Sequence, residues 1–509
     1  MLDKFLNSIT MYHLTFYVLI AFVVLAGLLG LVGLLPYSPL DIAISVATAI
    51  CASYVANYFF AKLFHAVTNK ESVFITALIL TLIIPVKMPQ SFPFIVGASV
   101  IAMGVKYFVT VQKRHLFNPA AAAVAAIAML SPEHTAIWWI GTPVMVPFVI
   151  IGGLLIVRKI RREDMVIMFL IVYAVLVIVF AFIHIGTLTS LISSLETGAL
   201  KSALFFFAFI MFTEPLTSPP TKKLQRVYAA LVAVLYATPQ MRLFGIAFTP
   251  EVALCLGNIF SFFVSPQYRL VLSLREKIQM TADTFAFMFN KVNAFQFVPG
   301  QYMEWTLPHE HADSRGNRRY FSLASSPTEA SPMITVKFYT PSSSYKRMLL
   351  GMKPGDEIIA SQLAGDFVLP KDLSKPLAFI AGGVGIAPFR SMIQYVVDNK
   401  LSTNIVLLFA NRHLDDIIFA DLLDKACDFG VTTYYTLTDR TAIPEGWQGF
   451  SGHITAEMIV RGIPDYNRRT FYISGPQLMV QQTDDVLRDM GISRRNIKTD
   501  FFPGYKENK

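Results

Sequence analysis

The pattern of hydrophobic and polar positions divides the chain into two halves. Ten apolar runs follow one another as far as about residue 265, and the stretch from Phe5 to Leu40 contains no Asp, Glu, Lys or Arg. Beyond Leu270 the apolar runs are shorter and alternate with polar residues, as they do from Ser331 to Phe338. Long uncharged runs are typical of membrane-spanning helices, and alternation is typical of half-buried strands. The pattern predicts a helical membrane domain over residues 1–269, followed by a soluble part.

The first half is expected to be all helical and to cross a membrane ten times. Several of its runs are shorter than the roughly 20 residues that a straight spanning helix needs. The expected spans lie at about residues 14–35, 40–60, 72–86, 92–111, 119–130, 143–157, 164–185, 202–214, 226–240 and 249–265.

Basic residues between the runs predict how this domain is oriented. Eleven of them lie in one set of alternate connections and three in the other. Because basic loops stay on the cytoplasmic side, the bias predicts a multi-pass protein of the cytoplasmic (inner) membrane, with both termini and the second half in the cytoplasm. The net charge of +9 follows from the same bias, so it gives no reason to expect a nucleic-acid partner. The eleven are Lys62, Lys70, Lys113, Arg114, Arg158, Lys159, Arg161, Arg162, Lys222, Lys223 and Arg226, and the three are Lys87, Lys201 and Arg242.

An internal repeat is visible at an offset of about 130 residues. The runs that begin at Ser72 and Ser202 both end in two closely spaced prolines, and Asn118-Pro119 matches Thr249-Pro250 at an offset of 131. With five spans in each repeat, the second must be inverted relative to the first. Both dipeptides are predicted helix starts, with the first residue as N-cap and proline at the first helical position. The free N–H groups of such starts either bind an anion, such as a flavin phosphate, or only shape the helix end.

Two motifs in the first half resemble a known family. The segments Leu116–Ala121 and Met211–Pro219 are similar to signatures of the B and D subunits of the sodium-pumping NADH:quinone reductase and Rnf complexes, and the likeness covers roughly residues 1–265. The string nearest to that family's covalent flavin site, Thr197-Gly198-Ala199-Leu200, has leucine at the acceptor position. The resemblance therefore implies a non-covalent FMN or a quinone in the membrane domain.

Polar residues near the repeated prolines are the candidates for a site in the membrane domain. Glu214 stands where the family usually has aspartate, and Glu251 is the other of the two chief carboxylates within the expected spans, each next to a repeat proline. A carboxylate within a membrane is a functional candidate, here for ion movement, although both residues would also fit as simple flanks of helix ends. The full candidate set is Asn118, Thr213, Glu214, Thr217, Ser218 and Glu251.

No metal site is expected. Haem between helices needs axial side chains such as His on facing spans, yet no two histidines share an expected span at ligand spacing. The three cysteines, Cys51, Cys255 and Cys427, form no Cys-x-x-Cys, so neither an iron–sulfur ligand set nor a disulfide framework is indicated.

The second half is expected to hold two domains. Alternating runs over residues 270–372 predict an antiparallel β-barrel. Over residues 373–509, strand-like and helix-like runs alternate, which predicts an α/β domain with a parallel sheet. The expected parallel strands are Leu377–Ala381, Ile405–Phe409, Thr432–Thr436 and Thr470–Ser474.

The order of motifs across this half resembles the ferredoxin–NADP reductase family, which implies FAD in the barrel domain and NADH or NADPH in the α/β domain. The box Arg319-Tyr320-Phe321-Ser322 would bind FAD: Arg319 on the pyrophosphate, Phe321 against the isoalloxazine, and Ser322 near the flavin N5. Gln301 and Tyr302 lie in the strand and turn beside the flavin. Ser343 and Ser344 precede a short predicted helix and would either meet the pyrophosphate or only cap a turn.

The α/β domain carries the matching nucleotide motifs. Gly382, Gly383, Gly385 and Pro388 follow an apolar strand and precede a helix, which is the context of a dinucleotide fingerprint. By the same resemblance, Ser474-Gly475-Pro476 would lie beside the nicotinamide, with serine in place of the usual cysteine. Tyr505 would cover the nicotinamide face of the flavin. The segments Ala410–Arg412 and Thr436–Arg440 lie where the adenosine ribose is expected. Either Arg412 or Arg440 would read a 2′-phosphate, but neither decides NADH against NADPH, and NADH is favoured.

These features together predict a membrane-bound oxidoreductase that passes electrons from NAD(P)H through FAD, with Ser322, Ser474 and Tyr505 as catalytic residues. The expected acceptor is a quinone or a second flavin in the membrane domain, with ion movement as a further possibility. The alternative is an NAD(P)H reductase of a soluble acceptor protein, whose membrane half is an anchor or a transport module.

Overall fold

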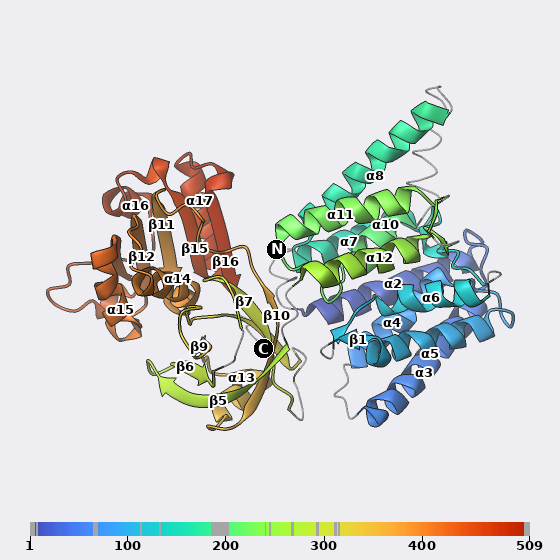
Figure 1. Ribbon diagram of the computed structural model, residues 1–509, viewed down its shortest axis with the longest axis horizontal. Helices are drawn as coiled ribbons and strands as arrows, with labels where there is room; N and C mark the ends of the chain where they lie inside the picture. Colours follow the sequence, from blue (N-terminus) through green and yellow to red (C-terminus); the bar gives the residue numbers. More distant parts are fainter. Residues whose placement is uncertain are drawn as a thin grey trace. The chain divides into compact units, whose positions relative to one another are not determined.

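The structure is a computed structural model, and it divides the chain into two compact units, Met1–Gln267 and Tyr268–Lys509. Figure 1 shows helices in the first unit, and strands with helices in the second. Each unit is described by itself. The described residues are 6, 9–64, 70–111, 114–131, 134–184, 203–239, 241–243, 246–265, 269–291, 295–309, 313 and 316–502.

In the described part of the first unit, a helix lies within each of the ten expected apolar segments. Three of these helices are long and apolar enough to cross a membrane: Met11–Leu31, Pro39–Leu63 and Glu163–Ile183. The others are shorter. The structure therefore supports three candidate spans, and the ten spans expected from the sequence stay a prediction. The helices are α2 (Met11–Leu31), α3 (Pro39–Leu63), α4 (Lys70–Ile83), α5 (Phe92–Phe108), α6 (Pro119–Leu130), α7 (Val146–Ile160), α8 (Glu163–His184), α10 (Leu204–Phe206), η2 (Phe207–Met211), α11 (Lys222–Ala237) and α12 (Pro250–Val264), with the short 3-10 turn η1 (Trp139–Gly141).

Exposed apolar side chains on the long helix α8 fit a lipid environment. Ile167, Ile171, Val175 and Phe182 are each more than half exposed and recur at helical spacing. In water such a stripe would be costly, whereas hydrocarbon accepts it without penalty. Together with the three long helices, this surface indicates membrane association.

One expected span is corrected by the structure. The segment predicted as a helix over 202–214 is helical only from Leu204 to Met211, and its last five residues form a π-helix. The hydroxyl of Thr213 then donates to the carbonyl of Phe209 at 2.7 Å, and proline follows Glu214. Because proline has no N–H to donate and clashes with a preceding turn, the helix cannot continue as a regular α-helix. π-turns of this kind are frequent at functional sites.

The sequence repeat has a structural counterpart. A two-residue antiparallel hairpin, β1 (Thr110–Val111) with β2 (Arg114–His115), precedes α6, and an equivalent hairpin, β3 (Arg242–Leu243) with β4 (Ile246–Ala247), precedes α12. Each hairpin ends with a matching backbone bond, from Leu116 N–H to Val109 and from Phe248 N–H to Met241. Both following helices have proline in their first turn, and they pack against each other. The repeated unit is therefore hairpin plus proline-initiated helix.

The second unit begins with a half-barrel sheet of six antiparallel strands in the order β8-β7-β10-β5-β6-β9. Large apolar side chains, among them Trp305, Phe287 and Tyr345, fill its interior. The strands are β5 (Arg269–Gln279), β6 (Thr284–Phe289), β7 (Tyr302–Thr306), β8 (Arg318–Ser322), β9 (Met333–Lys337) and β10 (Glu357–Ala364), and helix α13 spans Ser344–Gly351.

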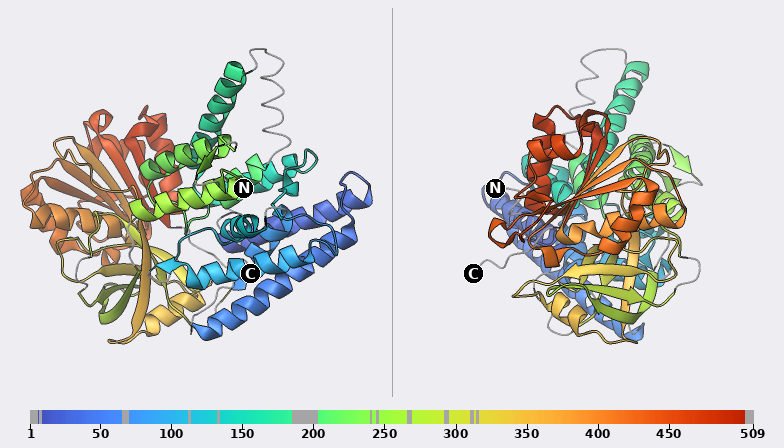
Figure 2. Two further views of the ribbon diagram at one scale, coloured as in Figure 1. Left: turned by 45° about the vertical axis from the view of Figure 1, so that its right-hand side comes forward. Right: turned by 90° about the vertical axis from the view of Figure 1, so that its left-hand side faces the viewer.

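The rest of the unit is a parallel sheet in the order β14-β13-β12-β11-β15-β16. Consecutive residues of β11 reach opposite faces, since Phe379 packs with Phe389 of α14 while Ile380 packs with Ile459 of α16. Helices therefore cover both faces, which is why the strands read as continuous apolar runs. Figure 2 shows this sheet in orange and red, apart from the yellow and green half-barrel. The elements are β11 (Leu377–Gly382), η3 (Gly383–Ile386), α14 (Ala387–Asp398), β12 (Ile405–Asn411), η4 (Leu414–Asp416), α15 (Ala420–Lys425), η5 (Ala426–Phe429), β13 (Val431–Leu437), η6 (Arg440–Ala442), β14 (Phe450–Ser451), α16 (Ala456–Gly462), η7 (Tyr466–Arg468), β15 (Thr470–Pro476), α17 (Gln477–Asp489), η8 (Arg494–Asn496) and β16 (Ile497–Phe502).

Candidate functional site

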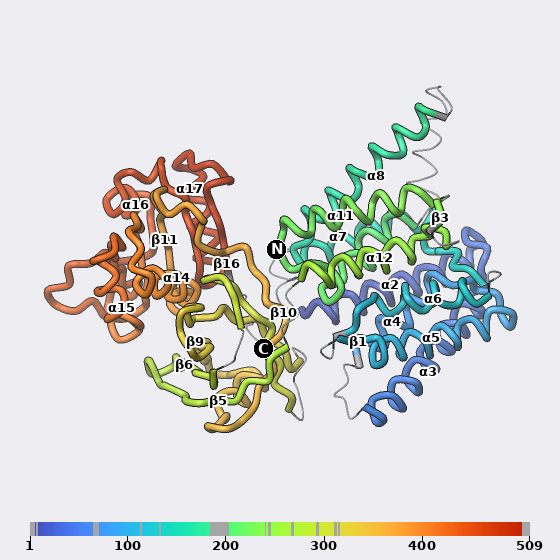
Figure 3. Tube along the Cα trace, in the orientation of Figure 1, coloured from blue at the N-terminus to red at the C-terminus, as the bar shows by residue number. Residues whose placement is uncertain are grey.

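The parallel sheet has a switch point between its neighbouring strands β11 and β15. From β11 the chain proceeds through β12 and β13 to one edge of the sheet, and it returns on the other side as β15 and β16. In open α/β sheets, ligands bind beyond the carboxyl ends of the strands at such a point. Here the carboxyl ends carry Gly382 and Ser474, which were the predicted nucleotide motifs. Figure 3 follows the trace from β11 into α14.

Glycines allow the two loops at this point to touch. A Cβ added to Gly385 would lie 2.4 Å from the carbonyl oxygen of Ser474 and 2.5 Å from the Cα of Gly475. A Cβ on Gly382 would lie 2.2 Å from the sulfur of Met479. Gly383 is different, because it has φ +52° and open space around its missing side chain. The predicted fingerprint thus combines two packing glycines with one that leaves room beside the N-terminus of α14.

Polar groups without a partner lie at the same edge of the sheet. Ser474 is fully buried, and its hydroxyl has no hydrogen-bond partner among the described residues. The side-chain amide of Asn411, at the end of β12, is also buried, and within the same described part of the chain neither its nitrogen nor its oxygen has a partner. Buried polar atoms are nearly always satisfied, so these groups fit a site that receives a polar ligand or ordered water.

An open pocket lies beyond β12 and β13, where the adenosine ribose is expected. It is lined by Arg412, Thr438, Asp439, Arg440, Gly452 and His453. The guanidinium of Arg412 lies 3.6 Å from the carboxylate of Asp439, and the His413 ring lies 4.0 Å from it. Hydrogen bonds from the side chain and backbone of Thr441, with smaller contributions from these two basic groups, lower the pKa of Asp439 below its usual value. The sequence placed the segments Ala410–Arg412 and Thr436–Arg440 at this ribose site, and Asp439 lies inside the second segment, although only the two arginines were given a role.

The predicted flavin box lies on β8, beside α13. The guanidinium of Arg319 lies 4.9 Å above the ring of Tyr345 and donates to the carbonyls of Arg318, at 2.6 Å, and Gly316, at 3.2 Å. The hydroxyl of Ser343 caps α13 by accepting the N–H of Lys346 at 3.2 Å. Arg319 and the N-terminus of α13 are therefore arranged to receive an anion such as a pyrophosphate.

A carboxylate already takes this anion position. Asp313 accepts the backbone N–H of Ser344 at 2.9 Å and lies 3.9 Å from the guanidinium of Arg319. The hydroxyl of Ser344 in turn accepts the N–H of Asp313 at 2.9 Å. Asp313 was not among the predicted residues: it lies six positions before Arg319 and belongs to no motif.

The remaining residues of the box fall on both faces of β8. Phe321 packs toward the half-barrel core, with its ring 6.1 Å from that of Tyr345. Tyr320 faces the other way, where its ring meets that of Tyr302 edge-on at 5.7 Å and its hydroxyl donates to Glu304 at 2.9 Å. Ser322 is buried, and in the part of the chain that the structure describes its hydroxyl has no hydrogen-bond partner. That orphaned hydroxyl is the observation here that best fits a flavin.

Gln301 has a local structural role. Its side-chain carbonyl accepts the N–H of Val298 at 2.8 Å, and its backbone carbonyl accepts the N–H of Leu323 at 2.9 Å. Gln301 thereby fixes the turn that leads into β7 next to the end of β8. Tyr505, the third predicted catalytic residue, and the segment 197–200 lie outside the described residues.

In the first unit, several candidate residues form one polar cluster around Glu214. Its carboxylate accepts the side-chain amide of Asn118 at 2.9 Å and the hydroxyl of Thr217 at 3.1 Å, and it lies 3.4 Å from the His115 ring nitrogen. The side-chain oxygen of Asn258, on α12, accepts the N–H of Asn118 at 2.8 Å. Three elements thus meet in this polar cluster: the N-cap of α6, the turn after η2, and the helix α12.

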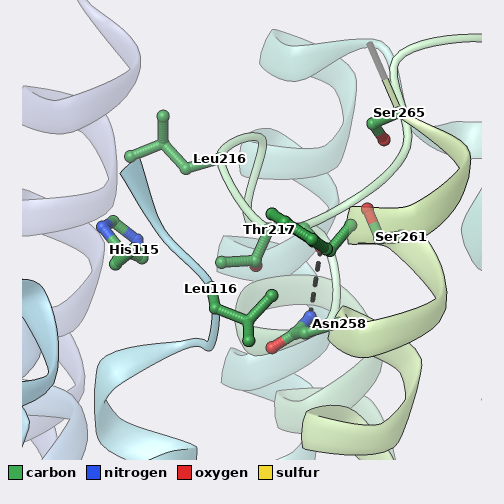
Figure 4. A pocket seen from close by; sticks show the side chains of 8 residues that line it. His115, Leu116, Leu216, Thr217, Asn258, Ser261 and Ser265 are labelled. Carbon is green, nitrogen blue, oxygen red and sulfur yellow. Dashed lines mark hydrogen bonds between the residues drawn. The ribbon is translucent and has the colours of Figure 1, made fainter. Parts of the chain in front are cut away.

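A small pocket adjoins this cluster. Figure 4 shows His115 and Leu116 on one side, Ser261 and Ser265 on the other, and the bond from Asn258 to the carbonyl of Thr217, which is 3.2 Å long. The pocket volume is about 10 Å³, which is about enough for one water molecule. An isoalloxazine or quinone ring would enter only if side chains moved.

The other membrane candidates form hydrogen bonds with groups other than the Glu214 carboxylate. Thr213 and Ser218 donate to carbonyls of their own turn, at 2.7 Å to Phe209 and 2.6 Å to Glu214. Glu251 is buried and accepts the indole N–H of Trp138 at 3.3 Å. His115 and Asn258 were not among the predicted site residues. The signal for Asn258 was an amide in the middle of an apolar run.

Comparison with known proteins covers the second half of the chain. A family model described as the oxidoreductase NAD-binding domain matches residues 379–485. The chain is 26% identical over 232 residues to the glycine betaine monooxygenase reductase subunit of Chromohalobacter salexigens, which covers 44% of this chain and 62% of that protein. It is 30% identical over 204 residues to NADH-cytochrome b5 reductase 1 of Emericella nidulans, covering 38% of this chain and 64% of that protein. The FAD/NAD-binding domain of nitric oxide dioxygenase from Vibrio cholerae is similar with a TM-score of 0.41 at 21% identity, covering 47% of this chain and 99% of that one.

The chain spans less than two thirds of the length of these curated relatives. The matches agree with the resemblance predicted for the second half: the NAD-binding family model covers residues 379–485, and both relatives are named as reductases. The resemblance of residues 1–265 to the sodium-pumping family stays a prediction.

Proposed function

We propose that this chain is a membrane-bound flavoprotein oxidoreductase that passes electrons from NADH through FAD to an acceptor in its membrane domain, a quinone or a second, non-covalent flavin. One observation carries the proposal: the same chain contains the touching Ser474 and Gly385 loops and a helical unit that has three candidate spans. When bound, FAD accepts a hydride and releases electrons singly or in pairs.

The residues of the second unit would bind and orient both cofactors. Arg319 and the Ser343-capped helix α13 would hold the flavin pyrophosphate once Asp313 has moved away. Phe321 would contact the isoalloxazine, and the orphaned hydroxyl of Ser322 would hydrogen-bond near N5. Gly383 would leave space for the nucleotide pyrophosphate at the N-terminus of α14, and the Ser474 hydroxyl would contact the nicotinamide.

Asp439 favours NADH over NADPH. Its carboxylate would accept the ribose hydroxyls, and a 2′-phosphate at the same position would meet like charge. Arg412, which would otherwise attract that phosphate, already lies 3.6 Å from Asp439. A proposed cytoplasmic location of the second unit matches the site of NADH production and follows from the basic loops.

Glu214 is the proposed centre of the membrane site. Asn118, Thr217 and His115 surround it, so it is placed to exchange a proton as the acceptor is reduced, and ion movement is a possible extension of that role. The test is NADH-driven reduction of a lipid quinone by purified Glu214→Gln protein in vesicles. We expect quinone reduction to fall while reduction of ferricyanide, which takes electrons directly from the flavin, is unchanged. Quinone reduction by Glu214→Gln at the rate of the unmodified protein would contradict the role of Glu214.

A second function is favoured by the small volume of the membrane pocket, which at about 10 Å³ has no room for a ring. In that case the first unit is an anchor or transport module, and the second unit reduces a soluble acceptor protein. Expression of residues 268–509 alone distinguishes the two, because an anchor is dispensable for activity with the physiological acceptor.

A further inference from the structure

The strand with the proposed flavin residues and the helix after the glycine loop are joined by direct side-chain bonds. Beyond Ser322, β8 continues into residues 323–329. The guanidinium of Arg390, in the first turns of α14, binds both carboxylate oxygens of Glu329, at 2.9 Å for the Nη2–Oε1 pair, and also donates to the carbonyl of Ala324 at 3.2 Å. The hydroxyl of Ser391 donates to the carbonyl of Ser325 at 2.6 Å.

This junction is largely shielded from solvent. The Arg390 side chain is 13% exposed and the Glu329 side chain 28%. Glu329 is itself held by the N–H of Ser326 at 2.6 Å, and Ser391 is fully buried. A bidentate ion pair between a guanidinium and a carboxylate fixes the orientation of the two groups as well as their distance. Beneath it, Ala387 packs in a small apolar cluster with Ala286, Ala324 and Met333.

A second bridge joins the half-barrel to the nucleotide side. The ammonium group of Lys337, at the end of β9, lies 3.1 Å from the carboxylate of Asp283 and 3.5 Å from that of Asp416. Asp416 also accepts the N–H of His413 at 3.1 Å, next to the ribose pocket. The half-barrel therefore contacts the parallel-sheet domain by charge at two places, one of them at the first turns of the helix that follows the glycine loop.

We propose that Arg390, Glu329 and Ser391 are positioning residues for hydride transfer. They tie the helix whose N-terminus would receive the nucleotide to the strand that would carry the flavin, and so set the separation of nicotinamide and isoalloxazine. This inference rests on the proposed NADH-to-FAD reaction. The physical reason is that transfer between two bound rings depends steeply on their separation, so that a displacement of about 1 Å lowers the rate by about a hundredfold.

The test measures flavin reduction in a single turnover by stopped-flow absorbance, with NADH and with NADH deuterated at C4. The variants are Glu329→Gln, Arg390→Lys and Ser391→Ala in the full-length, FAD-containing protein. Arg488→Gln is the matched control, because Arg488 pairs with Asp484 inside α17 and links no two domains. For the three variants we expect the reduction rate to fall at least about tenfold and the deuterium isotope effect to change, while the affinity for NAD⁺ stays within about twofold.

Other outcomes overturn either the positioning role or the proposed function. Reduction rates and isotope effects equal to those of the control overturn the positioning role. A fall in NAD⁺ affinity that accounts for the whole loss in rate also overturns it, because the residues then act in binding. If the ion-pair variants lose FAD or unfold, Ser391→Ala decides, since it removes one hydrogen bond and no charge. Failure of the unmodified protein to reduce its flavin with NADH overturns the proposed function itself, and the control shows that failure as well.

Discussion

The carboxylate of Asp313 accepts the backbone N–H of Ser344 at the start of α13, at 2.9 Å. The start of a helix attracts anions, because its first N–H groups are unpaired and the helix dipole is positive there. With Arg319 only 3.9 Å from the same carboxylate, Asp313 takes the place that the pyrophosphate of FAD would need. The chain thus contains an internal competitor for its own proposed cofactor.

Removing the charge of Asp313 should strengthen FAD binding. An anion at a helix start contributes about 1 kcal/mol, so Asp313→Asn should lower the dissociation constant of FAD by about fivefold. The measurement is fluorescence titration of the apoprotein with FAD. Asp356→Asn, in the turn that follows the C-terminal end of α13, is the control. Weaker binding by Asp313→Asn would show that the carboxylate belongs to the bound state.

Asp439 should determine the choice of nucleotide. We expect Asp439→Ser to raise kcat/KM with NADPH by about tenfold or more, because the 2′-phosphate then meets Arg412 without a facing carboxylate. Steady-state kinetics with both nucleotides and a soluble acceptor measure this ratio. An unchanged preference would show that the 2′ position lies elsewhere.

The pH dependence of that preference follows from the lowered pKa of Asp439, caused first by its bonds with Thr441. A carboxylate with a lowered pKa stays ionised above its usual range of about 4 and loses its charge only when the pH falls through the lowered value. Discrimination against NADPH by the unmodified protein should therefore stay constant between about pH 7.5 and pH 9, where the 2′-phosphate, with a second pKa of about 6, is fully ionised as well. A decline across that window would exclude Asp439 as its source.

The hydroxyl of Ser474 should matter for reaction more than for stability. It is buried without a partner, so Ser474→Ala removes an unsatisfied group and should leave the free energy of unfolding unchanged or slightly higher. Flavin reduction by NADH should nevertheless slow by about tenfold, as expected for the loss of one contact to the reacting ring. Thermal unfolding together with stopped-flow kinetics separates the two effects. A large loss of stability without a kinetic effect would make Ser474 a core residue.

Gly385 should tolerate no side chain. The Cβ of Gly385→Ala would lie 2.4 Å from a backbone oxygen of the Ser474 loop, so the two loops must separate, at a cost of about 1–3 kcal/mol in stability. Nicotinamide binding should be lost, as measured by titration with NAD⁺. Gly351→Ala is the control, because no atom lies within 4 Å of its added Cβ. Normal NAD⁺ binding by Gly385→Ala would mean that the nucleotide does not use this loop.

The sequence was most informative where local pattern and structure coincide. Four parallel strands were predictable, because a strand buried on both faces must be apolar throughout, as β11 is from Leu377 to Gly382. The glycine loop was predictable because glycines between an apolar strand and a helix are typical of a dinucleotide-binding turn. The repeat of proline-initiated helices in the first unit was visible as well, since Asn118 and Thr249 lie at equivalent helix starts, whereas the hairpins before them were not predicted.

Contacts between distant segments were not predictable. Asn118 and Glu214 are 96 residues apart, and nothing local to either residue indicates that they bond. The same holds for Asp313, whose partner Ser344 is 31 residues away. The π-helix at Phe207–Met211 also has no signature, because a uniformly apolar run fits an α-helix equally well. Such features depend on the packing of the whole unit.

The central claim is that electrons from NADH reach an acceptor through the membrane domain. Its most direct test reduces the bound flavin of the full-length protein with one equivalent of NADH, without oxygen, and then mixes the protein with vesicles that contain a lipid quinone. The account predicts that the flavin is reoxidised and that one quinol forms for each NADH consumed. A flavin that stays reduced beside the quinone, yet is reoxidised at once by ferricyanide, would contradict it.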